Sequence, residues 1–175
     1  MQCLMIARRR FVGYLGLAAS LCVGRTAAAD APAVPKGKII LTISGKIKNP
    51  NHGDAAEFDR EGLEALGMVT MQTATPWYSG VMTFEGVPMS KLLAAVGAYG
   101  TDVTALALND YSTTIPIADF TSYNVILALK RNGNYMPVSD KGPLFIVYPF
   151  DSAQELQQQK YYSRAAWQVA RLVVK

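Results

Sequence analysis

Short runs of strand-forming residues recur along this chain, and turn-forming residues separate them. In residues 38–48 the aliphatic residues Ile39, Leu41 and Ile43 alternate with Ile40, Thr42 and Ser44, which is typical of a strand with both faces at least partly covered. Asn132-Gly133 separates two such runs and is a strong signal for a β-hairpin. Strands are therefore predicted at residues 38–48, 68–75, 81–84, 105–108, 112–117, 125–131, 135–138, 144–149 and 167–174.

Helical patterns are few and short. Asp59 is placed to cap one helix, and Pro88 lies early in a second one. Loops or turns are predicted at residues 49–54, 75–80, 85–86 and 151–160, which are polar or rich in proline and glycine. Many strands with few short helices predict a single α+β domain with mixed β-sheets. We expect this domain at residues 39–175, after a flexible lead-in at residues 30–38.

The first 29 residues have the order of a signal peptide. Arg8-Arg9-Arg10 precedes an apolar run from Phe11 to Val23, and small residues follow up to Ala29. The apolar run is shorter than the roughly 20 residues that cross a bilayer. The arginines also resemble a twin-arginine signal. We therefore expect cleavage near Ala29 and export to the periplasm, with a retained membrane anchor or lipidation at Cys22 as alternatives.

Removing this segment changes the charge and the cysteine content. The chain has 17 basic and 13 acidic residues, but residues 1–29 hold four arginines and no acid, which leaves 13 of each sign. A neutral domain gives no support to nucleic-acid binding, so no nucleic-acid partner is expected. Cys3 and Cys22 are lost as well, so neither a disulfide nor a cysteine metal site is expected. His52 is the only histidine, which argues against a zinc site or a Ser/His/Asp triad.

Several segments occur in an order found in a known family. These segments are residues 41–47, 84–89 with Leu92-Leu93, 110–117, Asn132-Gly133, 141–144, and the pair Arg164 and Arg171. Over residues 39–174 the ordered set resembles the molybdopterin-binding domain of the sulfite-oxidase type. The resemblance implies that fold, with the segments after Lys141 and around Tyr162 forming part of a pterin pocket.

One feature of that family is missing here. The family holds molybdenum through a cysteine placed after the strand that here starts at Met68, and this chain has threonine in that region, residues 69–77. A threonine hydroxyl is not a soft thiolate ligand. In size, export signal and missing cysteine, the chain is similar to exported proteins of this fold that bind reduced pterins. Those proteins regulate a membrane-bound cyclic-di-GMP synthase/phosphodiesterase.

This resemblance implies a reduced pterin as ligand and the periplasmic region of such a membrane enzyme as partner. It implies neither a catalytic residue nor a metal site. The alternative is a molybdopterin-dependent oxidoreductase with an atypical, cysteine-free site. A third possibility is an interaction protein that kept the fold and lost the pocket.

A pterin site needs an aromatic or apolar wall for stacking and an acceptor for the N–H groups at the edge of the ring. The candidate pterin-binding residues are Thr75, Trp77, Asp110, Tyr111, Lys141, Tyr162, Ser163 and Arg164. Trp77 is either a stacking wall or an anchor for its loop. Asp110 is either the edge acceptor or a turn residue, and Asp151 is a second candidate for the acceptor.

The remaining candidates carry hydroxyl groups or positive charges. Lys141 and Arg164 are placed to meet a phosphate or a polar tail, with surface solvation as the alternative for Lys141. Tyr162 and Ser163 offer hydroxyl donors and a ring face. Trp167 is expected in the core, because it has strand spacing with the residues after it.

Overall fold

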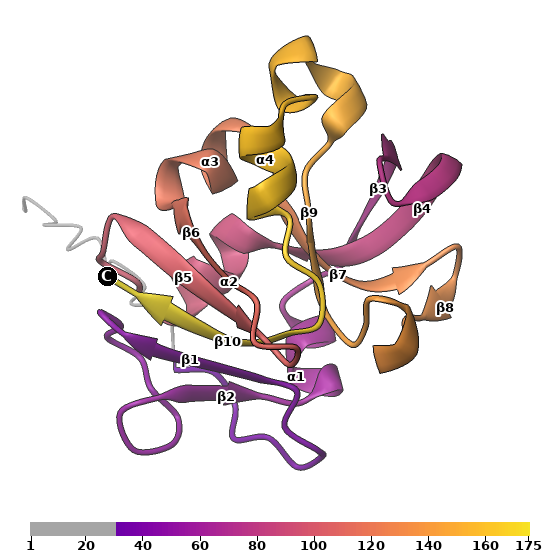
Figure 1. Ribbon diagram of the computed structural model, residues 1–175. Helices are drawn as coiled ribbons and strands as arrows, with labels where there is room; N and C mark the ends of the chain where they lie inside the picture. Colours follow the sequence, from indigo (N-terminus) through magenta and orange to yellow (C-terminus); the bar gives the residue numbers. More distant parts are fainter. Residues whose placement is uncertain (1–30) are drawn as a thin grey trace, which may run out of the picture.

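The computed structural model describes residues 31–175 (Figure 1). Its strands are β1 (Leu41–Gly45), β2 (Ala56–Phe58), β3 (Val69–Thr75), β4 (Tyr78–Pro88), β5 (Asp102–Ala107), β6 (Ser112–Pro116), β7 (Ile126–Arg131), β8 (Asn134–Tyr135), β9 (Phe145–Val147) and β10 (Val169–Val174). Its helices are α1 (Arg60–Ala65), α2 (Met89–Ala95), α3 (Ile117–Ser122) and α4 (Gln159–Arg164). The predicted α+β domain with mixed sheets is confirmed. The predicted signal peptide lies outside the described residues.

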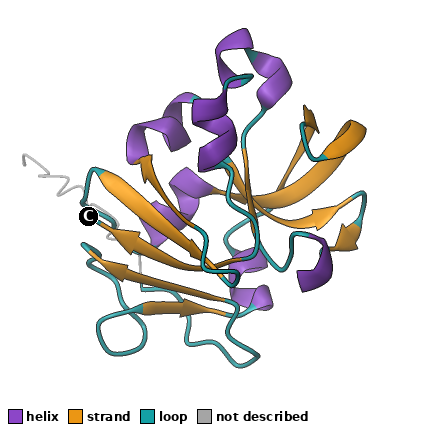
Figure 2. Cartoon of the chain, in the orientation of Figure 1, coloured by secondary structure: helices purple, strands orange, loops and turns teal. Residues whose placement is uncertain are grey.

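The strands form two sheets. The first has the order β2-β1-β10-β5-β6, and the second has the order β3-β4-β7-β8 with β9 paired to β7. β1 and β10 run parallel, with Thr42 opposite Arg171, and the other neighbours are antiparallel. In Figure 1 the first sheet lies at the lower left and the second at the right, with α3 and α4 at the top. Figure 2 shows that strands and loops make up most of the chain.

The two sheets meet where β9 runs past the segment that leads into β10. Ile146 N donates to Ala166 O at 2.9 Å, and Val169 N donates to Leu144 O at 3.0 Å. Aromatic side chains fill the space beside this junction, and Phe145 and Tyr148 are fully buried there. The junction therefore joins both sheets through one well-packed core.

None of the helices between residues 31 and 175 has the length and apolar character needed to cross a membrane.

Several local predictions are confirmed and several are wrong. Asn132 and Gly133 both have positive φ, at 49° and 79°, and they connect β7 to β8 as the hairpin signal predicted. The loop predicted at residues 75–80 is shorter, and β4 runs without interruption through the turn predicted at residues 85–86. Position 86 of that strand requires glycine, because a Cβ atom there would collide with the backbone of β7. The polar segment predicted as a loop at residues 151–160 instead forms 3-10 turns and the start of α4.

Asp59 caps α1 and also holds the segment that precedes β1. Its carboxylate accepts hydrogen bonds from Gly62 N at 2.8 Å, Gly37 N at 2.7 Å and Lys36 N at 2.8 Å. Residues 31–38, predicted as a lead-in, contain neither helix nor strand. These backbone donors, first Gly37 and then Gly62, hold the pKa of Asp59 below its usual value of 3.8.

Replacing Asp59 with alanine is expected to lower the free energy of unfolding by about 2 to 3 kcal/mol at pH 7. Because the pKa is lower in the folded state than in the unfolded state, this stabilisation is complete above the unfolded pKa. It is lost as the pH falls through the folded pKa, so the difference between the variant and the wild type should shrink below about pH 4. Urea unfolding at several pH values measures both effects. Asp54→Ala, at an exposed turn position, is the control and should change little.

Candidate functional site

An aromatic hollow lies at the junction of the two sheets. Its volume is about 260 Å³. It is lined by Pro76, Trp77, Tyr111, Gln159, Tyr162, Ser163, Ala165 and Trp167. The β3–β4 turn, the β5–β6 turn, α4 and the segment before β10 each contribute to this wall. Four of the eight predicted site residues, Trp77, Tyr111, Tyr162 and Ser163, are therefore brought together.

Trp77 is at the centre of the aromatic cluster. Its ring lies edge-on to those of Trp167 and Tyr162, with centroids at 5.3 Å and 6.2 Å. It also meets Phe145 at 5.6 Å and Phe150 at 6.0 Å, both in the core. Both interpretations of Trp77 thus describe part of its environment, because the ring anchors the turn on the core and also lines the hollow.

Two lining rings are parallel. Tyr111 and Trp167 lie with centroids 6.5 Å apart and an angle of 5° between their planes. The hydroxyl of Tyr111 donates to Ser163 O at 2.6 Å, which fastens the β5–β6 turn to α4. The parallel rings and the edge-on ring of Trp77 form walls against which a flat heterocycle can stack.

Thr75 lies two residues before Trp77 and is buried. Its hydroxyl has no hydrogen-bond partner among the described residues, although the oxygen is inaccessible to solvent. A buried polar group without a partner costs free energy, so a partner that the protein itself does not supply is expected here. The neighbouring Thr73 differs, because its hydroxyl donates to Ala74 O at 3.1 Å and accepts from Asp151 N at 3.3 Å.

Lys141 lies against the ring of Trp167. Its Nζ is 4.5 Å from the centroid of Trp167 and 5.4 Å from that of Tyr78. It therefore contacts the ring of a lining residue but does not line the hollow itself. A cation over an indole face stabilises the position of both groups.

The segment before Lys141 is fixed by a polar cluster. Arg131 Nη2 donates to Asp140 Oδ2 at 2.7 Å, and the Tyr78 hydroxyl donates to Asp140 Oδ1 at 2.9 Å. Burial, and then the hydrogen bond to Asp140, raise the pKa of Tyr78 to about 12. The phenol is therefore a neutral donor at physiological pH, and the cluster holds the 3-10 turn that leads to Lys141.

Three sequence candidates lie away from the hollow. Asp110 is exposed at the β5–β6 turn with φ of 63°, which fits its interpretation as a turn residue. Arg164 Nη1 donates to Asp119 Oδ2 at 2.6 Å, so its charge is neutralised between α3 and α4. Asp151 Oδ2 accepts from Ala74 N at 2.6 Å and ties a 3-10 turn to β3. None of these side chains lines the aromatic hollow.

Four lining residues were not among the candidates: Pro76, Gln159, Ala165 and Trp167. Trp167 was expected in the core, but it is only partly buried and forms one wall. The strand β10 begins at Val169, after this residue, so the strand spacing that suggested burial does not apply to it. Gln159 was assigned to a polar loop, and no local pattern distinguishes it from the glutamines around it.

The lining carries no charge. It contains no carboxylate, imidazole, thiol or amine. Across residues 31–175 no three His, Cys, Asp or Glu side chains are grouped so that they could hold a metal ion. The arrangement therefore suits the binding of a flat, largely uncharged ring, with Gln159 and Ser163 as polar contacts, better than it suits acid–base catalysis.

Comparison with known proteins identifies a family. Residues 29–156 match the family described as the oxidoreductase molybdopterin binding domain. The matched part extends from β1 through β9 and includes Trp77 and Tyr111. No curated protein matches the chain significantly.

Proposed function

The chain belongs to the oxidoreductase molybdopterin binding domain family, and from this premise we propose that its aromatic hollow binds a reduced pterin without a metal. The protein would then act as a pterin-dependent regulator in the periplasm. The observation that carries the proposal is the uncharged aromatic wall at the junction of the sheets. Pockets with a few polar groups among aromatic side chains are typical of sites for flat heterocycles.

The size of the hollow supports a small ring system. Its volume of about 260 Å³ lies just under the range of about 300 to 1,000 Å³ found for sites of drug-sized ligands. A bicyclic pterin stacked between Trp77 and the Tyr111–Trp167 pair would place its edge near the side chains of α4. Thr75 lies two residues before Trp77 in the sequence, and its unpaired hydroxyl is a further candidate donor or acceptor for the ligand.

The donor groups of this chain do not fit a molybdenum-loaded cofactor. Residues 31–175 contain no cysteine, so they offer no thiolate for the metal. The lining offers no lysine or arginine for a cofactor phosphate, and Arg164 is already paired with Asp119. These are features of the residues present, and they favour the pterin-binding proposal over the oxidoreductase alternative.

The proposed partner is the periplasmic region of a membrane-bound cyclic-di-GMP synthase/phosphodiesterase. The signal-like N-terminal segment and the lack of cysteine in the residues that follow it support this assignment. Residues 152–160 expose mainly polar side chains. The end of this segment is the start of α4, and Gln159 and Tyr162 of that helix line the hollow. Ligand binding can therefore favour one arrangement of α4, and the partner can recognise the surface beside it. Binding of such an enzyme only when the pterin is present would be the supporting result.

Replacing Tyr111 with alanine is expected to weaken binding of a reduced pterin by about 5- to 150-fold, the range found when an aromatic ring that stacks on a base is removed. Tyr111 is 42% exposed, so the fold should tolerate the change. Isothermal titration calorimetry with 6,7-dimethyltetrahydropterin under anaerobic conditions measures the affinity. Trp77 and Trp167, the two tryptophans of the chain, both line the hollow and report occupancy by fluorescence.

Tyr99→Ala is the matched control. Tyr99 is 57% exposed and lies outside the hollow, beside Lys48. Its replacement should leave the affinity unchanged. The proposal fails if the wild-type protein shows no saturable binding, or if both tyrosine variants bind the pterin equally.

A further inference from the structure

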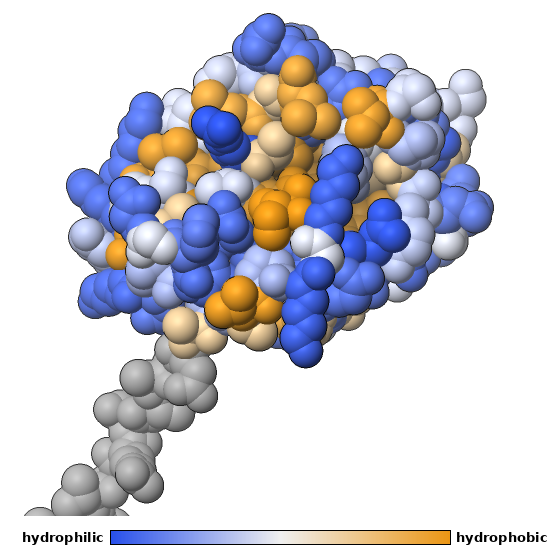
Figure 3. Space-filling model, turned by 90° about the horizontal axis from the view of Figure 1, so that it is seen from below, coloured by the Kyte–Doolittle hydropathy of each residue, from blue (hydrophilic) through white to orange (hydrophobic). Residues whose placement is uncertain are grey.

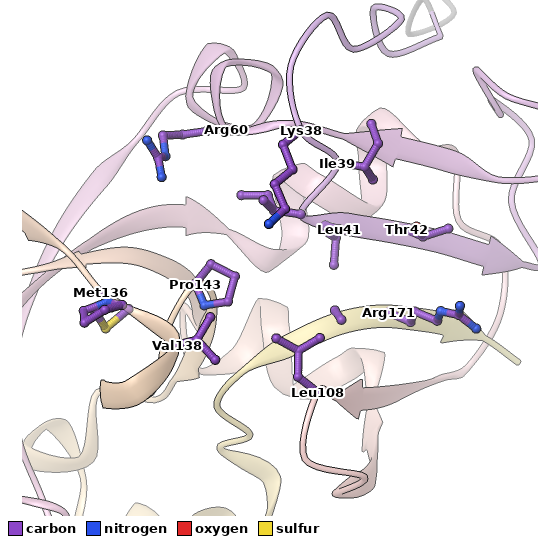
Figure 4. A pocket seen from close by; sticks show the side chains of 13 residues that line it. Lys38, Ile39, Leu41, Thr42, Arg60, Leu108, Met136, Val138, Pro143 and Arg171 are labelled. Atoms are coloured by element: carbon purple, nitrogen blue, oxygen red, sulfur yellow. The ribbon is translucent and has the colours of Figure 1, made fainter.

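A second hollow, which we call the cationic groove, shares no residue with the aromatic hollow. Its volume is about 450 Å³. It is lined by Lys38, Ile39, Ile40, Leu41, Thr42, Arg60, Leu108, Met136, Pro137, Val138, Pro143, Ala170 and Arg171. Figure 4 shows these residues arriving from the start of β1, the start of α1, the β5–β6 turn, the turn after β8, and β10.

The floor and one side of the groove are apolar. Leu41 is fully buried beneath it, whereas Ile39, Leu108 and Val138 are 37%, 55% and 51% exposed. These are three of the few large apolar side chains exposed in the described chain, and all three line this groove. Figure 3 shows a face on which apolar residues gather near the centre and hydrophilic side chains border them. Grouped apolar exposure of this kind marks a binding surface.

Three cations border the groove and no acid does. Lys38, Arg60 and Arg171 contribute to the lining, which contains neither aspartate nor glutamate. Within residues 31–175 none of the three forms an ion pair. In Figure 4 the side chain of Lys38 extends from the segment before β1 toward Val138 and Pro143, with Arg60 on the same side of the groove. The positive charge is therefore available to an incoming anion.

Arg60 is held in position before any ligand arrives. Its guanidinium lies 4.0 Å from the centroid of the Tyr135 ring. The Tyr135 hydroxyl in turn donates to Glu64 Oε1 at 2.6 Å. An arginine that is already oriented loses less conformational entropy when it binds an anion.

We propose that the cationic groove binds a small organic anion with an apolar body, of the class of medium-chain fatty carboxylates. The alkyl chain lies on Ile39, Leu108 and Val138, and the carboxylate faces Lys38 and Arg60. The volume falls within the range of about 300 to 1,000 Å³ for small-molecule sites. Charge complementarity selects an anion, and the apolar floor selects an amphiphile over inorganic phosphate.

Calorimetric titration of the purified protein with decanoate, below its critical micelle concentration, tests the proposal. One saturable site per chain is expected, and Lys38→Gln and Arg60→Gln should each weaken binding by about tenfold, as expected for loss of a contact to a charged group. Lys91→Gln, which removes an exposed lysine elsewhere, is the matched control and should bind decanoate like the wild type. Decanol, with the same chain and no charge, should bind at least about tenfold more weakly than decanoate.

Equal binding of decanol and decanoate would overturn the proposal, as would unchanged affinity in both Lys38→Gln and Arg60→Gln. Tighter binding of an acidic Leu/Glu peptide than of decanoate would also overturn it, in favour of a peptide-docking groove. The same variants should bind 6,7-dimethyltetrahydropterin normally, because the two hollows share no residue. Failure of this proposal is thus distinguishable from failure of the pterin site.

Discussion

Replacing Asp119 with alanine is expected to lower the free energy of unfolding by about 3 to 5 kcal/mol, because it leaves the charge of Arg164 without a partner between α3 and α4. Asp119 is only 8% exposed, and its Oδ2 accepts from Arg164 Nη1 at 2.6 Å and from the Tyr148 hydroxyl at 2.9 Å. Burial, and then the charge of Asp119, raise the pKa of Tyr148, so its hydroxyl stays a neutral donor. The substitution therefore removes at once the acceptor of the buried Tyr148 hydroxyl and of the partly buried Arg164 guanidinium.

A double-mutant cycle separates the pair from its surroundings. Arg164→Met removes the unpaired charge, so the double variant with Asp119→Ala should be less destabilised than the sum of the two single variants. Urea unfolding followed by tryptophan fluorescence gives all four stabilities. Strictly additive losses would show that the ion pair contributes no coupling. Pterin affinity should fall in Asp119→Ala as well, because Arg164 holds the end of the helix that carries Tyr162 and Ser163.

Gly142→Ala is expected to destabilise the protein by about 3 kcal/mol or more, since overpacking a site that cannot relax is strongly unfavourable. A Cβ atom at Gly142 would overlap the carbonyl group of Met136 and lie 2.8 Å from Pro137 O. Backbone atoms cannot move aside as the end of a flexible side chain does. The amide of Gly142 also donates to Pro137 O at 2.8 Å, so the two segments cannot separate without losing this bond.

Gly80→Ala is the control for this prediction. Gly80 has φ of 77°, but a Cβ atom there would meet nothing within 4 Å. Its replacement should cost about 1 to 2 kcal/mol, from the left-handed backbone alone. Chemical denaturation of both variants makes the comparison. If they lose equal stability, close approach of the backbone at Gly142 is not the cause.

The strands with strong local signals were predictable from the sequence. Asn132-Gly133 determined its hairpin, because both residues adopt the positive φ that a two-residue turn requires. Asp59 was predicted as a helix cap, and its side chain bonds to Gly62 N. What the sequence could not show is the approach of distant segments. Gly86 looked like a turn residue, yet it lies in β4. The position is glycine because the backbone of β7 passes too close for any side chain.

Part of the candidate site could be predicted from the sequence, and the rest depends on the approach of distant segments. Trp77 and Tyr162 belong to aromatic segments that the family resemblance indicated, and they line the aromatic hollow. The pairing of Arg164 with Asp119 was not foreseen, because Asp119 lies 45 residues earlier on a helix that the sequence did not predict. Nothing local shows whether an arginine faces a ligand or a buried carboxylate. That depends on how α3 and α4 come together.

The arrangement of the first sheet also sets the order in which the protein can be completed. β10 lies between β1 and β5, but it follows every other strand along the chain. During synthesis β1 and β5 are made long before their shared neighbour, so each waits with an open edge able to pair with another molecule. A protease that removes β10, or a premature stop before it, leaves two separate sheet fragments and removes the support of Trp167. Loss of β10 is therefore expected to disrupt the aromatic hollow.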